Sequence, residues 1–220
     1  MNDLSNDFSK MVKVKRACAW NTFDVARLQI SVGQSYHEGA DLEATVKWAK
    51  NNFKKVIVCV NDTLQRHNFE FEGDVPNVAR TKAEAAGREW IEENYKILST
   101  LPNVEIIRWD QWNNSSTRKM ESLYETIPLF KKTIDDEIKN FWARRSSKQG
   151  YNATDWASFR EHAKRYLIEE CAVFAKMFER DRAADIYPGS TLIPCTLLKG
   201  MGQYGFTRIE FKQDIKPRVA

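Results

Sequence analysis

The feature that most constrains the fold is a continuous apolar run, Lys55-Val-Ile-Val-Cys-Val60. A strand that is apolar at consecutive positions is buried on both faces, which is typical of a parallel sheet covered by helices. Helical spacing surrounds this run: Asp41 is placed to cap a helix that reaches about Phe53, and a second helix is expected over about 77–101. The order of strands and helices therefore predicts an α/β fold with a Rossmann-like parallel sheet flanked by helices.

The rest of the chain continues this alternation. The further elements are expected as strands over 104–109, near 190–198 and over 205–212, and as helices over 117–126, 128–145 and 155–182, with a basic flexible break at 144–150. A chain of 220 residues, 42% of them hydrophobic, can build one well-buried core. We expect a single domain over residues 1–220, in which residues 1–16 form a flexible or peripheral segment.

The composition argues against several classes of protein. No apolar run approaches the roughly 20 residues that span a membrane, and the first residues lack the order of a signal peptide. The four cysteines are scattered and form no spaced cluster with the three histidines, so we expect free thiols in the cytoplasm and no metal site. The net charge of +4 is compatible with a polyanionic partner but does not identify one.

A strand that begins near Arg27 is expected to be polar on one face. Alternate residues of a strand point to opposite sides, and the side opposite Leu28, Ile30 and Val32 consists of Arg27, Gln29, Ser31 and Gly33. A buried polar group without a partner costs about 1–3 kcal/mol, so such a stripe is expected to line a cavity. Ser31 stands where the strand meets its loop, the place where open α/β sheets bind ligands. Ser31 is therefore a candidate nucleophile, unless it is an ordinary loop hydroxyl.

The long helix expected over 155–182 carries a carboxylate on its apolar face. Glu170 lies four residues after Tyr166, so the two side chains share one face of the helix. A buried carboxylate has a cationic partner or binds a cationic ligand, such as the ammonium group of a substrate. The alternatives are that Glu170 pairs with an arginine such as Arg27, or lies in water at the edge of the face. Glu169 is expected to be an ordinary solvated residue.

The two motifs together resemble the tRNA-dependent cyclodipeptide synthases. The residues that match are Ile30-Ser-Val-Gly-Gln-Ser-Tyr36 and Tyr166-Leu-Ile-Glu-Glu170, and the resemblance covers nearly the whole chain. It implies a fold similar to the catalytic domain of class Ic aminoacyl-tRNA synthetases. It also implies an enzyme that makes a cyclic dipeptide from two aminoacyl-tRNAs, by a ping-pong mechanism, without ATP or another cofactor. Ser31 would carry the acyl group, while Tyr166 and Glu170 would hold the aminoacyl ammonium group.

The resemblance further implies a substrate pocket beside the serine. The residues expected to line this pocket are Arg27, Gln29, Gly33, Gln34, Val58 and Val173, and backbone amides around Gly33 are candidates for stabilising an oxyanion. Arg27 suits a carboxylate or another hydrogen-bonding side chain, so at least one polar or acidic amino acid is expected in the product. The alternative is that Arg27 neutralises Glu170 or a neighbouring helix carboxylate.

The chain also departs from the family pattern. Ala172 replaces a proline that usually follows the carboxylate motif, and a tyrosine expected near residue 193 is missing, for which Tyr187 and Tyr204 are both candidate replacements. The segment 88–98, where some members carry a basic helix that docks tRNA, is not basic here. A tRNA-binding surface is expected instead at Lys131, Lys132, Arg144, Arg145, Arg160, Lys164 and Arg165, unless these charges are simply a solvated face.

Two other functions compete with this interpretation. A nucleotide-binding enzyme would need a glycine-rich phosphate loop, and the segment from Ser31 to Ser35 holds a single glycine. A non-catalytic module that binds tRNA or protein would keep the basic face, but would have no reason to place Ser31, Tyr166 and Glu170 together.

Overall fold

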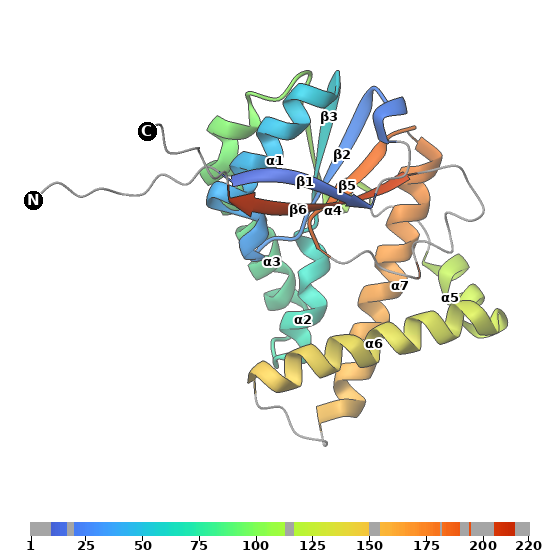
Figure 1. Ribbon diagram of the computed structural model, residues 1–220. Helices are drawn as coiled ribbons and strands as arrows, with labels where there is room; N and C mark the ends of the chain where they lie inside the picture. The colour runs from blue at the N-terminus through green and yellow to red at the C-terminus, as the bar shows by residue number, and fades with distance from the viewer. Residues whose placement is uncertain are drawn as a thin grey trace, which may run out of the picture.

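Five parallel strands form the centre of the molecule, and a sixth, antiparallel strand lies at one edge (Figure 1). The computed structural model describes residues 10–16, 20–112, 117–149, 155–180, 182–189, 194 and 205–213. The strands are β1 (Lys10–Arg16), β2 (Val25–Ile30), β3 (Lys55–Val60), β4 (Glu105–Arg108), β5 (Ala184–Tyr187) and β6 (Gly205–Gln213). Their order in the sheet is β1-β6-β5-β2-β3-β4. The predicted Rossmann-like α/β fold is confirmed.

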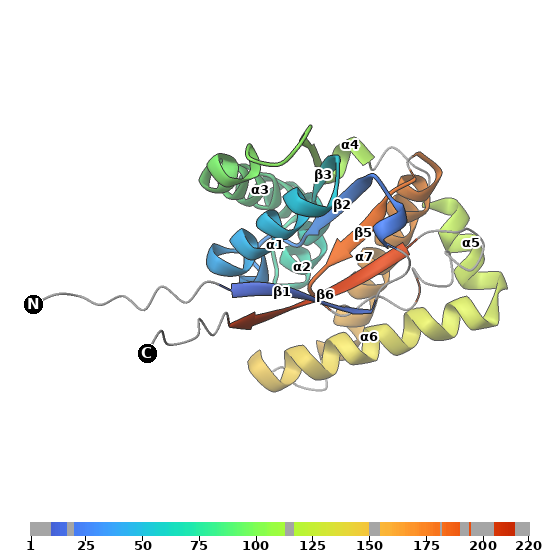
Figure 2. The same cartoon turned by 45° about the horizontal axis from the view of Figure 1, so that its top comes forward.

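Helices cover both faces of the sheet (Figures 1 and 2). They are α1 (Gly39–Asn52), α2 (Arg66–Phe71), α3 (Pro76–Leu98), α4 (Trp109–Trp112), α5 (Arg118–Thr126), α6 (Pro128–Gln149) and α7 (Trp156–Arg180), with short 3-10 helices at Trp20–Thr22, Ser35–His37 and Thr63–Gln65. Helices α1 and α3 pack on one face, and α7 with α2, α5 and α6 packs on the other. In the part of the chain that the structure describes, no helix is both long and apolar enough to cross a membrane.

Strand β3 belongs to both hydrophobic cores, as its continuous apolar run predicts. Val56, Val58 and Val60 pack toward α1 and α3, whereas Ile57 and Cys59 pack toward α7. All five side chains are fully buried. The alternation of side chains along a strand thus divides one run of sequence between two layers of helices.

The ends of two predicted helices differ in the structure. Helix α1 begins at Gly39, so Asp41 lies in its first turn and pairs with Lys10 of β1 instead of capping the helix. Helix α6 continues through Gln149, and the flexible break predicted at 144–150 is wrong for its helical part. Arg144 and Arg145 each have a carboxylate partner there, so the adjacent positive charges do not interrupt the helix.

The edges and the C-terminal part of the sheet also differ from the prediction. Residues 10–16 form the edge strand β1, which pairs with β6, and residues 1–9 lie outside the described residues. The strand that follows α7 is β5, at 184–187, whereas the predicted strand at 190–198 lies almost wholly outside the described residues. Strand β6 agrees with the prediction for 205–212.

The structure corrects the expected position of Arg27. Its side chain is fully buried, and its guanidinium binds Asp185 on the neighbouring strand β5, with Nε to Oδ1 at 2.8 Å and Nη2 to Oδ2 at 2.9 Å. It also donates a hydrogen bond to the carbonyl of Met177 in α7. The register of the parallel pair β2–β5 sets Arg27 directly opposite Asp185, so its partner is a strand carboxylate and neither Glu170 nor a helix carboxylate.

Arg27→Leu is expected to lower the free energy of unfolding by about 3–5 kcal/mol, because it leaves the buried Asp185 carboxylate without its guanidinium. Urea denaturation followed by circular dichroism measures the loss. The double variant Arg27→Leu/Asp185→Leu removes both charges and should recover much of it. An equal loss in the single and double variants would show that the charge pair is not the cause.

Candidate active site

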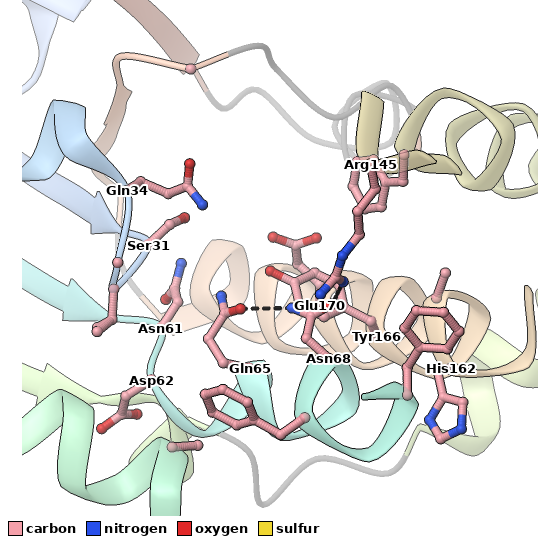
Figure 3. Close-up of a pocket in the computed structure, with 18 of the residues that line it drawn as sticks. Ser31, Gln34, Asn61, Asp62, Gln65, Asn68, Arg145, His162, Tyr166 and Glu170 are labelled. Atoms are coloured by element: carbon pink, nitrogen blue, oxygen red, sulfur yellow. Dashed lines mark hydrogen bonds between the residues drawn. The ribbon is translucent and has the colours of Figure 1, made fainter. Parts of the chain in front are cut away.

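A cavity of about 740 Å³ lies where the carboxyl ends of the central strands meet helices α2, α6 and α7. One wall consists of the end of β2, the loop that follows it and Asn61 at the end of β3. The opposite wall comes from α6 and α7 (Figure 3). Parallel strands end at the same edge of a sheet, which brings residues far apart in the sequence into one site.

Ser31 follows the last residue of β2 and faces this cavity. Its Oγ lies 3.1 Å from the hydroxyl of Tyr187 at the end of β5, and that hydroxyl lies 2.9 Å from the hydroxyl of Tyr36. Burial raises the pKa of Tyr187, so the phenol keeps its proton at neutral pH. Of the two candidates for the missing tyrosine, Tyr187 is the one found at the serine; Tyr204 lies outside the described residues.

The loop after Ser31 is shaped by a glycine. Gly33 has a φ of 81°, a left-handed conformation that side chains other than glycine rarely adopt. Both Gly33 and Gln34 line the cavity, as does Gln29 on β2. The expected lining residue Val58 instead packs against the helices on the far face of the sheet.

Val173 also does not reach the cavity. It is fully buried in the core between α7 and the sheet, on the side of the helix that packs rather than the side that faces the hollow. The expected pocket lining is therefore wrong for Arg27, Val58 and Val173, since these three side chains are committed to internal packing.

Tyr166 and Glu170 project from α7 into the cavity, across from Ser31 (Figure 3). Glu170 is only 7% exposed, and Oε2 has no hydrogen-bond partner among the described residues. Burial, reinforced by the charges of Glu137 and Glu169, raises the pKa of Glu170 to about 8. Burial and the charge of Glu170 also raise the pKa of Tyr166 well above its ordinary value. The site thus has a buried carboxylate that no cation of the described chain satisfies.

The neighbouring Glu169 is not solvated, contrary to expectation. It is buried and accepts hydrogen bonds from the guanidinium of Arg66 and from Trp109 Nε1, the latter at 2.7 Å. Its Oε2 also lies 3.0 Å from His67 Nε2. Burial is the largest single influence and raises the pKa of Glu169, but the hydrogen bonds from His67, Arg66 and Trp109 and the charge of Arg66 together outweigh it and lower the pKa to about 2. Glu169 therefore attaches α7 to α2 and α4, and this attachment sets the rotation of α7 that turns Glu170 into the cavity.

Sequence reasoning missed several polar residues of the site. Asn61 and Gln65 follow β3 and line the cavity, and Gln65 Oε1 accepts a hydrogen bond from Asn68 at 2.7 Å (Figure 3). A polar pair directly after the buried strand, Asn61-Asp62, is a signal that could have indicated them. Within the described ranges, no group of three or more His, Cys, Asp and Glu residues is placed to hold a metal ion.

The seven basic residues expected to bind tRNA belong to α6 and α7. Arg144 and Arg145 also line the cavity. Each of the seven has an intramolecular partner: a carboxylate for Lys131, Lys132, Arg144, Arg145, Arg160 and Arg165, and the ring of Tyr124 for Lys164. The surface they form is therefore partly neutralised by acidic side chains.

Glu170→Gln is expected to weaken the pH dependence of stability. The folded pKa of about 8 lies above the ordinary value of 4.5, so between these values the unfolded chain releases a proton that the folded protein retains. The wild-type free energy of unfolding should therefore fall from pH 4.5 to pH 8, by on the order of a few kcal/mol, and should fall less in the variant.

Urea denaturation at a series of pH values measures this slope, and equal slopes in the two proteins would contradict the assignment. Glu169→Gln is the matched control of opposite sign. The folded pKa of Glu169 is about 2, below the ordinary 4.5, so its charge stabilises the fold above that value and the stabilisation is lost as the pH falls toward 2. The control should accordingly be destabilised at neutral pH.

This architecture is similar to that of several proteins of known structure. No family model and no curated protein sequence matches the chain. A structure described as a CDPS from Fluoribacter dumoffii has a TM-score of 0.83 at 24% identity, over 93% of this chain and 100% of the other. A cyclodipeptide synthase from Candidatus Glomeribacter gigasporarum, bound to Phe-tRNAPhe, has a TM-score of 0.65 at 18% identity, over 89% and 90% of the two chains.

A third similar structure links the fold to a wider group. A Mycobacterium tuberculosis protein matches with a TM-score of 0.69 at 16% identity, over 94% of each chain. Its description states that cyclodipeptide synthetases are related to type I tRNA synthetases. The order of strands, the covering helices and the nearly complete overlap lead to one conclusion: this chain has the fold of the cyclodipeptide synthases.

Proposed function

We propose that this protein is a tRNA-dependent cyclodipeptide synthase. The observation that carries the proposal is one cavity that holds a serine hydroxyl bonded to a tyrosine hydroxyl and, across from it, a buried carboxylate without a cation among the described residues. An aminoacyl ester has a matching electrophilic carbonyl and a matching ammonium group. The similarity of the fold to solved structures of cyclodipeptide synthases, one of them bound to Phe-tRNAPhe, supports this interpretation.

In the first step, Ser31 Oγ attacks the ester carbonyl of an aminoacyl-tRNA. The carbonyl carbon gains a bond to Oγ and loses its bond to the ribose oxygen of the tRNA, which leaves as a hydroxyl. Tyr187 takes the proton of Ser31 and gives its own to the leaving oxygen, with Tyr36 as its second hydrogen-bond partner. An ester is already activated, so the step requires neither ATP nor a Ser-His-Asp arrangement.

Glu170 and Tyr166 position the acyl group. The substrate ammonium supplies the cation that Glu170 lacks among the described residues, and this charge favours the ionised form of the carboxyl. Holding the ammonium on α7 and the carbonyl at Ser31 aligns the reacting atoms. Backbone amides of the loop around Gly33 are the candidates for stabilising the oxyanion.

The second half of the reaction uses another aminoacyl-tRNA. The ammonium of the amino acid on Ser31 first gives a proton to Glu170, and the resulting amine attacks the second ester. A second proton of this nitrogen goes to the ribose oxygen of the departing tRNA, and a dipeptide remains on the serine. The free amine of this dipeptide then attacks the seryl ester, which closes the ring and restores the Ser31 hydroxyl. The products are one cyclic dipeptide and two tRNAs, a ping-pong sequence.

We propose the basic residues of α6 and α7 as the surface that docks tRNA. Ion pairs at an exposed surface contribute at most about 1 kcal/mol, so phosphates can replace the acidic partners. Arg144 and Arg145 connect this surface to the cavity. Aminoacyl-tRNA substrates place the reaction in the cytoplasm.

Ser31→Ala is expected to abolish the product, with a loss of at least about 10³-fold, because it removes the hydroxyl that carries the acyl chain in the proposed mechanism. Mass spectrometry of material released from a pool of aminoacyl-tRNAs measures it, and the product masses identify the amino acids joined. Ser35→Ala, in the same loop but outside the cavity lining, is the control and should keep wild-type activity. If wild type also releases no cyclic dipeptide, a non-catalytic binding module is the better interpretation.

Tyr187→Phe is expected to slow acylation of Ser31 by about 10²–10⁴-fold, because it removes the hydroxyl that transfers the proton. Single-turnover measurement of acyl-enzyme formation isolates this step, and the KM for aminoacyl-tRNA should change little. Tyr36→Phe removes the outer hydroxyl of the same chain and should cost less. Acylation at the wild-type rate in Tyr187→Phe would rule out the proton-transfer role.

A further inference from the structure

Gln29 has an unusual position among the residues of the cavity. Its side chain is only 1% exposed, yet it borders the cavity that contains Ser31. Its amide nitrogen donates to Asp185 Oδ1 at 2.9 Å and lies 3.5 Å from the sulfur of Met177. No donor of the described chain reaches its amide oxygen, Oε1. A buried acceptor that receives no hydrogen bond lowers the stability of the protein unless a ligand supplies a donor.

The orientation of this amide is determined by its neighbours. Both oxygens of Asp185 accept N–H groups of Arg27, so the carboxylate faces Gln29 as an acceptor. The amide must therefore turn its NH₂ group toward Asp185, and Oε1 is left as an acceptor. A flipped amide would set its oxygen against the carboxylate.

Gln29 is also within reach of an acyl group on Ser31. The two residues are two positions apart on the same face of one extended segment, so their Cα atoms lie roughly 7 Å apart. Two other lining residues also have a buried side-chain atom without a partner among the described residues, Asn61 Oδ1 and Glu170 Oε2, and both atoms are oxygens. The interior of the cavity therefore has acceptors to satisfy, and Glu170 is already assigned to the substrate ammonium.

We propose that the first amino acid loaded onto Ser31 has a side chain with an N–H or O–H donor, which binds Gln29 Oε1. This inference rests on the proposed function and names its substrate class. It narrows the polar or acidic side chain expected from Arg27 to one with a hydrogen-bond donor, since that guanidinium is already held by Asp185. An aliphatic side chain would leave the acceptor unpaired, and a carboxylate would place two acceptors in contact.

The test begins with the wild-type protein. It is mixed with a pool of aminoacyl-tRNAs and quenched in acid, and the mass added to the intact protein identifies the residue on Ser31. The expected adducts carry the side chain of Ser, Thr, Tyr, Trp, His, Asn, Gln, Lys or Arg. A predominant adduct with any other side chain, accompanied by cyclic dipeptide, overturns this inference and leaves the proposed function intact. The absence of both adduct and cyclic dipeptide overturns both.

Gln29→Met then tests the residue itself with little change in shape. Wild type should acylate with the donor-bearing amino acid at least about tenfold faster than with its closest analogue without the donor, for example Tyr against Phe or Thr against Val. The variant should lose most of this preference.

Gln65→Met is the matched control for product choice. It makes the same replacement at a second glutamine of the cavity, one whose Oε1 already has a partner in Asn68. It should retain the wild-type preference, whatever its effect on rate. An unchanged preference in Gln29→Met overturns the assignment to Gln29.

Discussion

The buried pair of Arg27 and Asp185 is the interaction on which the rest of the site depends. It joins residues that lie opposite each other on β2 and β5. Ser31 directly follows β2 and Tyr187 is the last residue of β5, and their hydroxyls lie 3.1 Å apart. The same carboxylate holds the amide of Gln29. A buried ion pair contributes little net stability, because desolvation offsets its attraction, but breaking it is costly. Its effect here is to select one alignment of the strands that build the site.

Helix α7 carries two adjacent carboxylates, Glu169 and Glu170, whose surroundings differ. Glu169 is ionised and satisfied by groups from α2 and α4, whereas Glu170 has no cation among the described residues and a raised pKa. Neighbouring residues of a helix point about 100° apart, so fixing one side chain also fixes the other. The contacts of Glu169 therefore also hold Glu170 in its buried position at the cavity.

Much of the fold and part of the site could be predicted because the signals are local. The apolar run of β3, the polar stripe that ends at Ser31 and the spacing of Tyr166 and Glu170 all lie within a few residues of sequence. The failures are of another kind. The sequence predicts Arg27 as a substrate ligand or as the partner of a helix carboxylate, and predicts Glu169 as solvated. The actual partner of Arg27 is 158 residues away, and those of Glu169 are 60 to 103 residues away. Tyr187 stayed one of two candidates for the same reason.

The sequence by itself determined which residue types recur at which spacing, and hence the layers of the fold, the serine after β2 and the Tyr–Glu pair on α7. Only the tertiary structure decided which polar groups satisfy one another and which remain for a ligand. Local periodicity depends on the geometry of a single helix or strand, whereas the pairing of buried charges depends on the register between β2 and β5 and on the rotation of α7. That difference separates Arg27, whose guanidinium binds Asp185, from Gln29, whose side-chain oxygen has no partner among the described residues.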